Sequence, residues 1–371
     1  MPYVAHKTYP ACITPALSEP QAERHLVSHL FNIAMMVFGA AALSWMMHKL
    51  GWSRFREVVD NVGWYFAAIL ALDVTAVLLD ARALHTFMRP EARMVSYWRV
   101  VAAQISGRAV NVVTPFGALG EATKLTMLVS HAPRNRVLSA IVLYNLAALY
   151  LSVAAMVIGT PITLLLVDLP SSLKITVGVG LAVLIPLMIA LGVIVRRGAL
   201  STLTGVLRRI RVISAARHDA WRARLQEVDR HIGELHKNRS AGTWKGILWV
   251  LASHLVTWTS TMLLIHAVGV AITPQLVIGV LSVGVLIQWI ASIVPLGLGL
   301  ADGGNYALYD LLGASGAHGT FVTMLNRVRS LGVAMVGFVA MAIVHSINRL
   351  DLLRQRRKLR DLKAALDHHA Q

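Results

Sequence analysis

The feature that most constrains this chain is a Pro/Gly break that occurs twice inside apolar sequence. Residues 114–121 read Thr-Pro-Phe-Gly-Ala-Leu-Gly-Glu, and residues 294–302 read Val-Pro-Leu-Gly-Leu-Gly-Leu-Ala-Asp. Each copy has a proline, a glycine two residues on, a further glycine and then a carboxylate. An unwound backbone in hydrocarbon survives only where protein or water satisfies its N–H and C=O groups. A matched pair of interrupted segments therefore indicates a translocation site.

The composition places the chain in a membrane. Of its 371 residues, 56% are hydrophobic and 14% are charged, whereas a soluble domain has about 25% charged residues. The formal net charge is +17, and much of it lies in two blocks. Residues 196–245 hold 12 Lys/Arg against 4 Asp/Glu, and residues 349–371 hold 7 against 3. Because both blocks flank apolar spans, they indicate positive-inside anchors facing anionic lipid and not a nucleic acid site.

Motifs for metals and cofactors are missing from the sequence. Cys12 is the single cysteine, which excludes an internal disulfide and a cysteine zinc cluster. The 15 histidines are scattered, without an H-E-x-x-H pair. No ATP-binding loop and no serine nucleophile elbow occurs. We expect no metal and no cofactor.

Apolar runs long enough to cross the bilayer predict six full transmembrane helices. They cover about residues 26–47, 62–79, 137–158, 173–195, 247–268 and 325–347. We expect a disordered N-terminal arm at 1–26, a basic cytoplasmic loop at 196–245 and a basic cytoplasmic tail at 348–371. Within the loop, apolar residues at four- and three-residue steps over 221–235 predict an amphipathic helix. That helix either lies on the cytoplasmic leaflet, packs beneath the bundle or is a solvated linker.

The two breaks are predicted to be re-entrant, broken helices. Arginines on both sides of the first break place both flanks in the cytoplasm, so this segment enters and leaves on one side. Treating 275–313 as a second hairpin, from the outside, keeps both basic blocks cytoplasmic. The alternative is a full span at 275–295. The predicted fold is an all-α integral membrane protein with an inverted-topology repeat, in which about 27–160 and 173–347 are the two copies.

The two breaks, with their flanking residues, resemble the motifs of the lysylphosphatidylglycerol synthase transmembrane-region family. Asn111-x3-Pro115-x-Gly117-x2-Gly120-Glu121-x2-Lys124 is similar to its first motif. Pro295-x-Gly297-x-Gly299-x2-Asp302, followed by Leu312-Gly313 and Arg327, is similar to its second, which usually ends in glutamate. The resemblance covers residues 27–347. It implies the lipid-flipping half of such proteins without their aminoacyl-transferase domain, and some stand-alone members are associated with hopanoid synthesis.

The candidate site comprises the polar residues and glycines around the two breaks. The candidate substrate-binding residues are Arg108, Asn111, Pro115, Gly117, Gly120, Glu121, Lys124, Pro295, Gly297, Gly299, Asp302 and Arg327. The two acids either face a headgroup or cap the N-termini of short helices. The cations either form a basic path for phosphate or, for Lys124 and Arg327, snorkel to the interface.

Two further polar residues have expected roles inside the bundle. Asp73, deep in the second span, is expected either to pair with Arg108 or Lys124 or to couple proton movement. Asn111 is expected to hold backbone freed by Pro115.

We therefore expect a non-enzymatic lipid translocator of the bacterial inner membrane, with both termini cytoplasmic. It would flip an anionic or isoprenoid-type lipid through a cleft between the repeats. Its partners would be membrane lipids and not nucleic acid, and Gly/Ala-rich spans permit a homodimer. Two alternatives are a membrane-embedded transferase acting on a lipid-linked substrate, and a non-catalytic scaffold that partners lipid-biosynthesis enzymes.

Overall fold

A computed structural model describes most of the predicted repeats. It covers residues 37, 60, 62–89, 91–114, 118–166, 182–190, 192–193, 226, 230, 240–292 and 299–369. Several predicted features lie outside these residues. They are the arm at 1–26, nearly all of the first span and of the loop at 196–239, and Pro115, Gly117, Pro295 and Gly297 at the two breaks. The predicted span at 173–195 is helical over 182–190 and 192–193.

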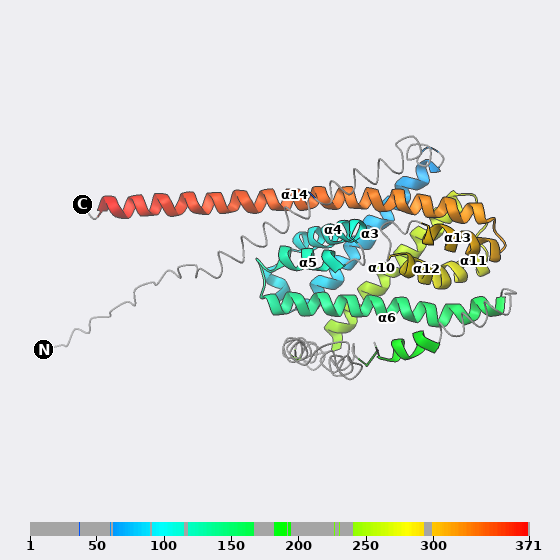
Figure 1. The fold of residues 1–371 in the computed structure, drawn as a ribbon. Coiled ribbons are helices and arrows are strands. Elements are labelled where there is room, and N and C mark those ends of the chain that lie inside the picture. The colour runs from blue at the N-terminus through cyan, green and yellow to red at the C-terminus, as the bar shows by residue number, and fades with distance from the viewer. Residues whose placement is uncertain are drawn as a thin grey trace.

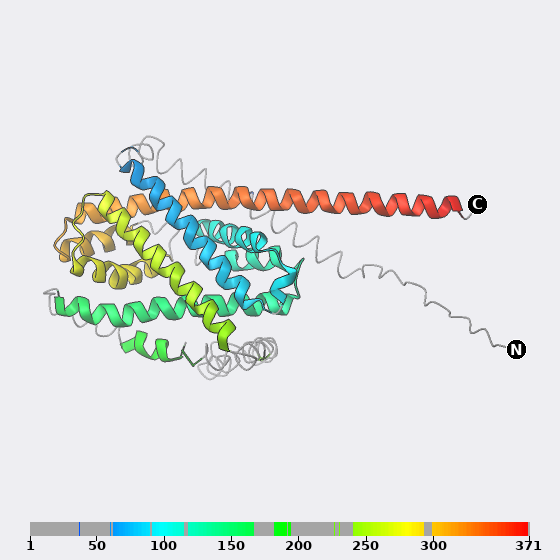
Figure 2. The same cartoon turned by 180° about the vertical axis from the view of Figure 1, so that it is seen from behind.

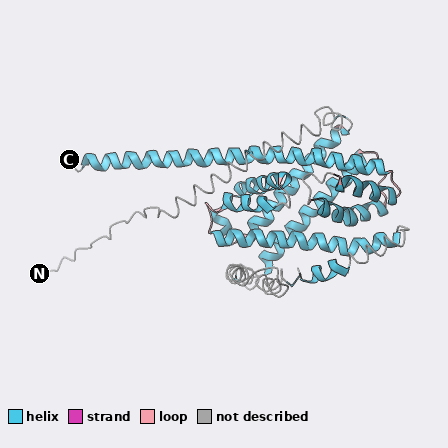
Figure 3. Cartoon of the chain, viewed as in Figure 1, coloured by secondary structure: helices cyan, strands magenta, loops and turns pink. Residues whose placement is uncertain are grey.

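Every regular element among the described residues is a helix (Figure 3). The elements are α3 (Trp64–Phe87), η1 (Glu91–Met94), α4 (Tyr97–Val113), α5 (Ala118–Leu128), α6 (Arg134–Leu166), α10 (Ser240–Ala267), α11 (Pro274–Gly279), the π-helical η3 (Val280–Gly284), α12 (Val285–Ala291), α13 (Leu300–Leu311) and α14 (Gly316–His369). We call α4 with α5 the first helical hairpin, and α11 to α13 the second helical hairpin.

Four described stretches are long and apolar enough to cross a membrane. They are Arg134–Leu166, Gly242–Ala267, Pro274–Ala291 and Gly316–Ser346. The chain is therefore an all-α membrane protein, as the sequence predicts, while the number of six full spans stays a prediction. The stretch Pro274–Ala291, expected as one limb of a re-entrant hairpin, is itself among the four.

The outer surfaces of these helices are apolar. Ile158 and Leu165 of α6, Leu248 of α10, and Val339 and Ile343 of α14 are all exposed. Large apolar side chains on the outside of a helix bundle mark a surface that contacts hydrocarbon or another protein. The exposed face agrees with a membrane location.

The helices are arranged as two halves around a crossed centre. α6 and α14 lie on opposite sides of the bundle and run in opposite directions (Figure 1). The first helical hairpin fills one end of the space between them, and the second helical hairpin fills the other. α3 and α10 cross the bundle side by side and make its most extensive helix contact (Figure 2).

Each helical hairpin packs on the long helix that follows the other hairpin. α4 packs along α14, where a Cβ on Gly337 would lie 2.5 Å from the carbonyl oxygen of Ile105. η3 packs along α6, where a Cβ on Gly159 would lie 2.7 Å from the Cβ of Ser282. Glycine at a helix crossing lets two backbones approach closely in a membrane. The two halves are therefore joined by the same kind of contact.

Local sequence explains how the second helical hairpin begins its helices. The Thr273 hydroxyl accepts a hydrogen bond from the Leu276 N–H, and Pro274 stands at the first position of α11. Both are preferred at a helix N-terminus because they satisfy or remove free N–H groups. At α13, Gly299 has φ of +82°, a backbone conformation that favours glycine, and it turns the chain into the helix.

The apolar core has a separate part for each helical hairpin. One cluster joins α3, α4, α5, α6 and α14, with Leu84, Val110 and Leu143 fully buried. A second cluster joins α3, α10, α11, α13 and α14, with Leu276 and Leu325 fully buried. The polar side chains between these two clusters form the candidate site.

Candidate functional site

A cavity of about 820 Å³ lies inside the bundle. Residues of α3, α4, α6, α10, η3, α12, α13 and α14 line it, so both halves of the molecule contribute. Four of its lining side chains are charged, namely Asp73, Arg108, Arg327 and Arg329. The position between the two helical hairpins is where the sequence predicts a cleft.

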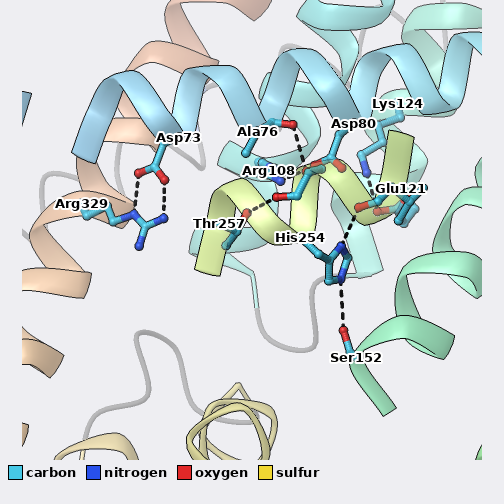
Figure 4. Close-up of polar contacts among 12 residues, drawn as sticks. Asp73, Ala76, Asp80, Arg108, Glu121, Lys124, Ser152, His254, Thr257 and Arg329 are labelled. Carbon is cyan, nitrogen blue, oxygen red and sulfur yellow. Dashed lines mark hydrogen bonds and ion pairs between the residues drawn. The ribbon is translucent and has the colours of Figure 1, made fainter. Parts of the chain in front are cut away.

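Arg108 of α4 is the most accessible cation of the cavity. Its Nη2 donates to Oδ2 of Asp80 on α3, and the Asp80 side chain is 3% exposed while that of Arg108 is 35% exposed. The carboxylate thus holds the guanidinium from behind (Figure 4). An arginine has five N–H donors in a planar fork, so a single bond to Asp80 leaves donors for an anion.

Asp73 of α3 forms a two-pronged ion pair with Arg329 of α14 (Figure 4). Its Oδ1 also accepts a hydrogen bond from the hydroxyl of Ser260 on α10, at 3.3 Å. The sequence-based pairing of Asp73 with Arg108 or Lys124 is therefore wrong. Asp73 and Asp80 lie two helical turns apart on α3, and each binds a different arginine.

Arg327 of α14 binds Asp302 of α13, with 2.6 Å between Nη2 and Oδ2. The same carboxylate oxygen accepts the backbone N–H of Gly299, at 2.9 Å. Asp302 lies in the first turn of α13, so the expected capping role is confirmed. Asp302 does not itself line the cavity, but it holds Arg327, which does.

Lys124 and Glu121 of α5 lie behind the cavity and do not line it. Lys124 Nζ donates to Glu121 Oε1 at 2.8 Å and lies 5.4 Å from the ring centre of Tyr144. Lys124 is 4% exposed, so it does not snorkel, and Arg327 does not either, because its side chain is 13% exposed and paired. Burial against the aromatic ring and the carboxylate stabilises the lysine inside the bundle. The predicted basic path therefore includes Arg108 and Arg327 but excludes Lys124.

The first helical hairpin is closed by a contact between two glycines. The Asn111 Oδ1 accepts the backbone N–H of Gly120 at 2.8 Å, in the first turn of α5. A Cβ on Gly120 would lie 2.2 Å from the carbonyl oxygen of Gly107, so only glycine fits there. Asn111 thus holds a backbone group next to the break, while its expected role toward the backbone freed by Pro115 stays a prediction. Asn111 also lines the cavity, one turn from Arg108.

The opposite side of the cavity has uncharged polar and aromatic side chains. His254 of α10 has its Nδ1 3.0 Å from the carbonyl oxygen of Val250 and its Nε2 3.4 Å from the hydroxyl of Ser152 on α6. A carbonyl only accepts, so Nδ1 donates to it, and Nε2 shares a hydrogen bond with the serine hydroxyl. Trp258 packs edge-on against the same imidazole, with 6.3 Å between ring centres.

The structure brings together some of the sequence-predicted residues and separates others. Asp73, Arg108, Asn111 and Arg327 line the cavity. Gly120, Glu121, Lys124, Gly299 and Asp302 support this lining from behind or beside it. The substrate-binding roles of all of them stay predictions.

Sequence reasoning missed several residues at the cavity. Asp80 follows the predicted span 62–79, and its spacing of seven from Asp73 places both acids on one helix face. Arg329 follows Arg327 by two residues and offered the same intramembrane-charge signal. His254, Trp258 and Gln288 stand in ordinary apolar helices, and nothing in their local sequence marks them.

Among the described residues, no three His, Cys, Asp or Glu side chains gather as potential metal ligands. The family model for the lysylphosphatidylglycerol synthase TM region matches residues 32–337. Neither the search of curated proteins nor the search of solved structures gave a match.

Proposed function

Since the chain belongs to the lysylphosphatidylglycerol synthase transmembrane-region family, we propose that it moves an anionic lipid between the leaflets of a bacterial inner membrane. On this proposal the protein is a transporter and not an enzyme. The charged lining of the cavity receives the headgroup, while the lipid tails stay in the surrounding hydrocarbon.

The proposed topology is an inverted repeat with two re-entrant hairpins. α5 has 11 residues and is about 17 Å long, too short for a hydrocarbon core of about 30 Å. α4, with 17 residues, is about 26 Å long. The two helical hairpins lie at opposite ends of the bundle, and α6 and α14 run in opposite directions, which supports entry from opposite faces (Figure 1). The basic loop and tail support cytoplasmic termini.

One observation carries the proposal, namely the partly exposed guanidinium of Arg108 inside a cavity of a membrane bundle. A charge within the membrane is costly and marks a substrate or ion pathway by default. Asp80 fixes the guanidinium of Arg108 in place, and the remaining N–H donors of this guanidinium match the oxygens of a phosphate. Arg327 and Arg329 also line the cavity, and each binds a carboxylate.

The proposed cycle uses the cavity as a half-way site. A headgroup enters sideways between the helices and binds Arg108. Movement of the two halves against each other then opens the cavity to the other leaflet. The contacts of α4 with α14 and of η3 with α6 are close crossings between the halves, and sliding at these crossings would produce the movement.

The test is lipid exchange in proteoliposomes containing a fluorescent anionic phospholipid, with a membrane-impermeant quencher. Arg108→Lys keeps the charge beside Asp80 but loses the planar fork, so we expect exchange to fall at least about tenfold. Arg93→Lys, an exposed arginine of η1 outside the cavity, is the matched control and should exchange normally. Wild-type exchange no faster than in empty vesicles, or normal exchange by Arg108→Lys, would overturn the proposal, and the latter would favour a scaffold role.

A further inference from the structure

The two walls of the cavity differ in charge. The charged wall consists of the lining residues of α3, α4 and α14, which include Asp73, Arg108, Arg327 and Arg329. The uncharged wall consists of the lining residues of α6, α10, η3, α12 and α13, and among these described residues there is no Asp, Glu, Lys or Arg. A ligand that contacts both walls must therefore have a charged end and a neutral end.

The charged wall is suited to one anionic group. Arg327 and Arg329 are each neutralised by an aspartate, and Asp73 binds Arg329 with both oxygens. The side chains of these two arginines are 13% and 14% exposed, against 35% for Arg108. Arg108 is therefore the position with the most unused donors, and Asn111 adjoins it. This end of the cavity fits a single phosphate.

The uncharged wall offers hydrogen-bonding groups and aromatic surface. The hydroxyl of Thr257 donates to a backbone carbonyl of its own helix, so its oxygen is left as an acceptor. Gln288 of α12 has an amide with both donor and acceptor atoms, and it is exposed to the cavity. Trp258 and Trp289 add two indole rings. His254 lies within hydrogen-bonding distance of a backbone carbonyl through Nδ1 and of the Ser152 hydroxyl through Nε2.

This combination matches the chemistry of a polyhydroxyl group. Hydroxyl groups donate to and accept from amides and threonine oxygens, while the C–H faces of a sugar or polyol pack against indole rings. The cavity of about 820 Å³ is also at the upper part of the size range of small-molecule sites, about 300–1,000 Å³. A bare phosphate at Arg108 would leave the uncharged wall without a ligand contact.

We propose that the transported lipid has a phosphate that carries a neutral polyhydroxyl headgroup, either a glycosyl group or a polyol. The phosphate binds Arg108 on the charged wall, and the hydroxyl groups contact Thr257, Trp258 and Gln288 on the uncharged wall. This inference rests on the proposed lipid translocation. It adds the chemical class of the group beyond the phosphate.

The experiment compares two lipids of equal charge in proteoliposomes of the full chain. Both have one fluorescent acyl chain and a monoanionic phosphodiester; phosphatidylinositol carries a ring of hydroxyls, and phosphatidylethanol carries an ethyl group. We expect wild-type protein to exchange phosphatidylinositol about tenfold faster, the effect of one or two net hydrogen bonds.

Two variants locate the preference on the uncharged wall. Gln288→Leu and Trp258→Leu should each lower the ratio of phosphatidylinositol exchange to phosphatidylethanol exchange toward one. Trp249→Leu is the matched control, since Trp249 lies on α10 with Trp258 but outside the cavity and is 36% exposed. It should keep the full preference. Arg108→Lys should slow both lipids equally, because the phosphate is common to them.

The outcomes separate this inference from the proposed function. Exchange of both lipids at equal rates by the wild type would overturn the inference and leave translocation intact. A preference that survives in both Gln288→Leu and Trp258→Leu would also overturn it, because the hydroxyl groups would then be recognised elsewhere. Exchange of neither lipid above the rate of empty vesicles would contradict both proposals.

Discussion

The two walls of the cavity occupy matching places in the order of the helices but have different chemistry. α3 and α10 precede the first and the second helical hairpin, and α4 and α12 belong to the first limbs of these hairpins. α6 follows the first hairpin and α14 follows the second. Ion pairs join helices of the charged wall from α3 to α14 and from α3 to α4, and Arg327 joins α14 to α13. The uncharged wall has a hydrogen bond between His254 and Ser152. Similar backbone arrangements thus have different electrostatics, and the stability of each wall should respond differently to substitution.

The largest expected effect is on the ion pair between α3 and α14. Asp73→Ala leaves Arg329 as an uncompensated buried charge and should destabilise the protein by about 3–5 kcal/mol. The measurement is the apparent Tm of the purified protein in detergent.

The double variant Asp73→Leu/Arg329→Met is the control for this pair. It removes both charges and keeps apolar volume, so it should recover most of the lost stability. If the double variant recovers none of the lost stability, the loss in Asp73→Ala comes from local packing and not from the uncompensated charge of Arg329.

The next effect compares the two helical hairpins. Gly120→Ala places a Cβ 2.2 Å from the Gly107 carbonyl and should force α4 and α5 apart, at a cost of about 1–3 kcal/mol. Gly303→Ala in α13 has no neighbouring atom within 4 Å and should be neutral or slightly stabilising. Thermal unfolding of both variants side by side gives the difference. Equal Tm values would show that the first hairpin is not closed by this contact.

A smaller effect tests the uncharged wall. Ser152→Ala removes the hydrogen bond to His254, and interhelical hydrogen bonds in membranes average about 0.6 kcal/mol. The expected fall in Tm is therefore far below that of Asp73→Ala. The same thermal scan measures both. A loss as large as that of Asp73→Ala would remove the energetic contrast between the walls.

The smallest effect concerns a titratable side chain at the base of the first hairpin. Burial lowers the pKa of His131, in the connection from α5 to α6, and nearby Arg99 lowers it further. The folded protein thus favours the neutral imidazole of His131. The neutral imidazole contributes its full stabilisation above the unfolded pKa of about 6.5, and this contribution is lost as pH falls through the lower pKa of the folded state.

The side chain introduced by His131→Gln is neutral at every pH, so this variant should not show the loss of stability that His131 causes when the pH falls. Between pH 7.5 and 5, wild type should lose about 1–2 °C more in Tm than His131→Gln. The same decline in both proteins would mean that His131 contributes no acid sensitivity.

The helices could be predicted from the sequence much better than the side-chain pairs. Apolar runs located α3, α6, α10 and the apolar part of α14, since a span needs about 20 apolar residues. The predicted spans were shorter than the helices. α14 begins at Gly316 and α6 at Arg134, in sequence that is too polar for hydropathy to mark as part of a span. Asp302 and Asn111 could be assigned because each binds backbone within nine residues.

The partner of Asp73 could not be predicted from local sequence. Arg329 lies 256 residues away, and its choice over Arg108 depends on where α3 lies relative to α14 and α4. The two walls likewise arise only when helices far apart in the sequence pack around one cavity. A sequence pattern records which charges enter the membrane, whereas their pairing is a property of the packed bundle.

The length of α14 has a mechanical consequence. Its 54 residues form a single helix of about 80 Å, so roughly 50 Å extends past a hydrocarbon layer of about 30 Å. Arg327 and Arg329 lie near its N-terminal end, and Figure 1 shows the rest projecting beyond the bundle to the C-terminus. A stiff rod pivoting near the cavity turns a tilt of a few degrees into a displacement of several ångströms at its tip. The tail is thus a natural lever, and a distance probe attached there would amplify motions of the charged wall.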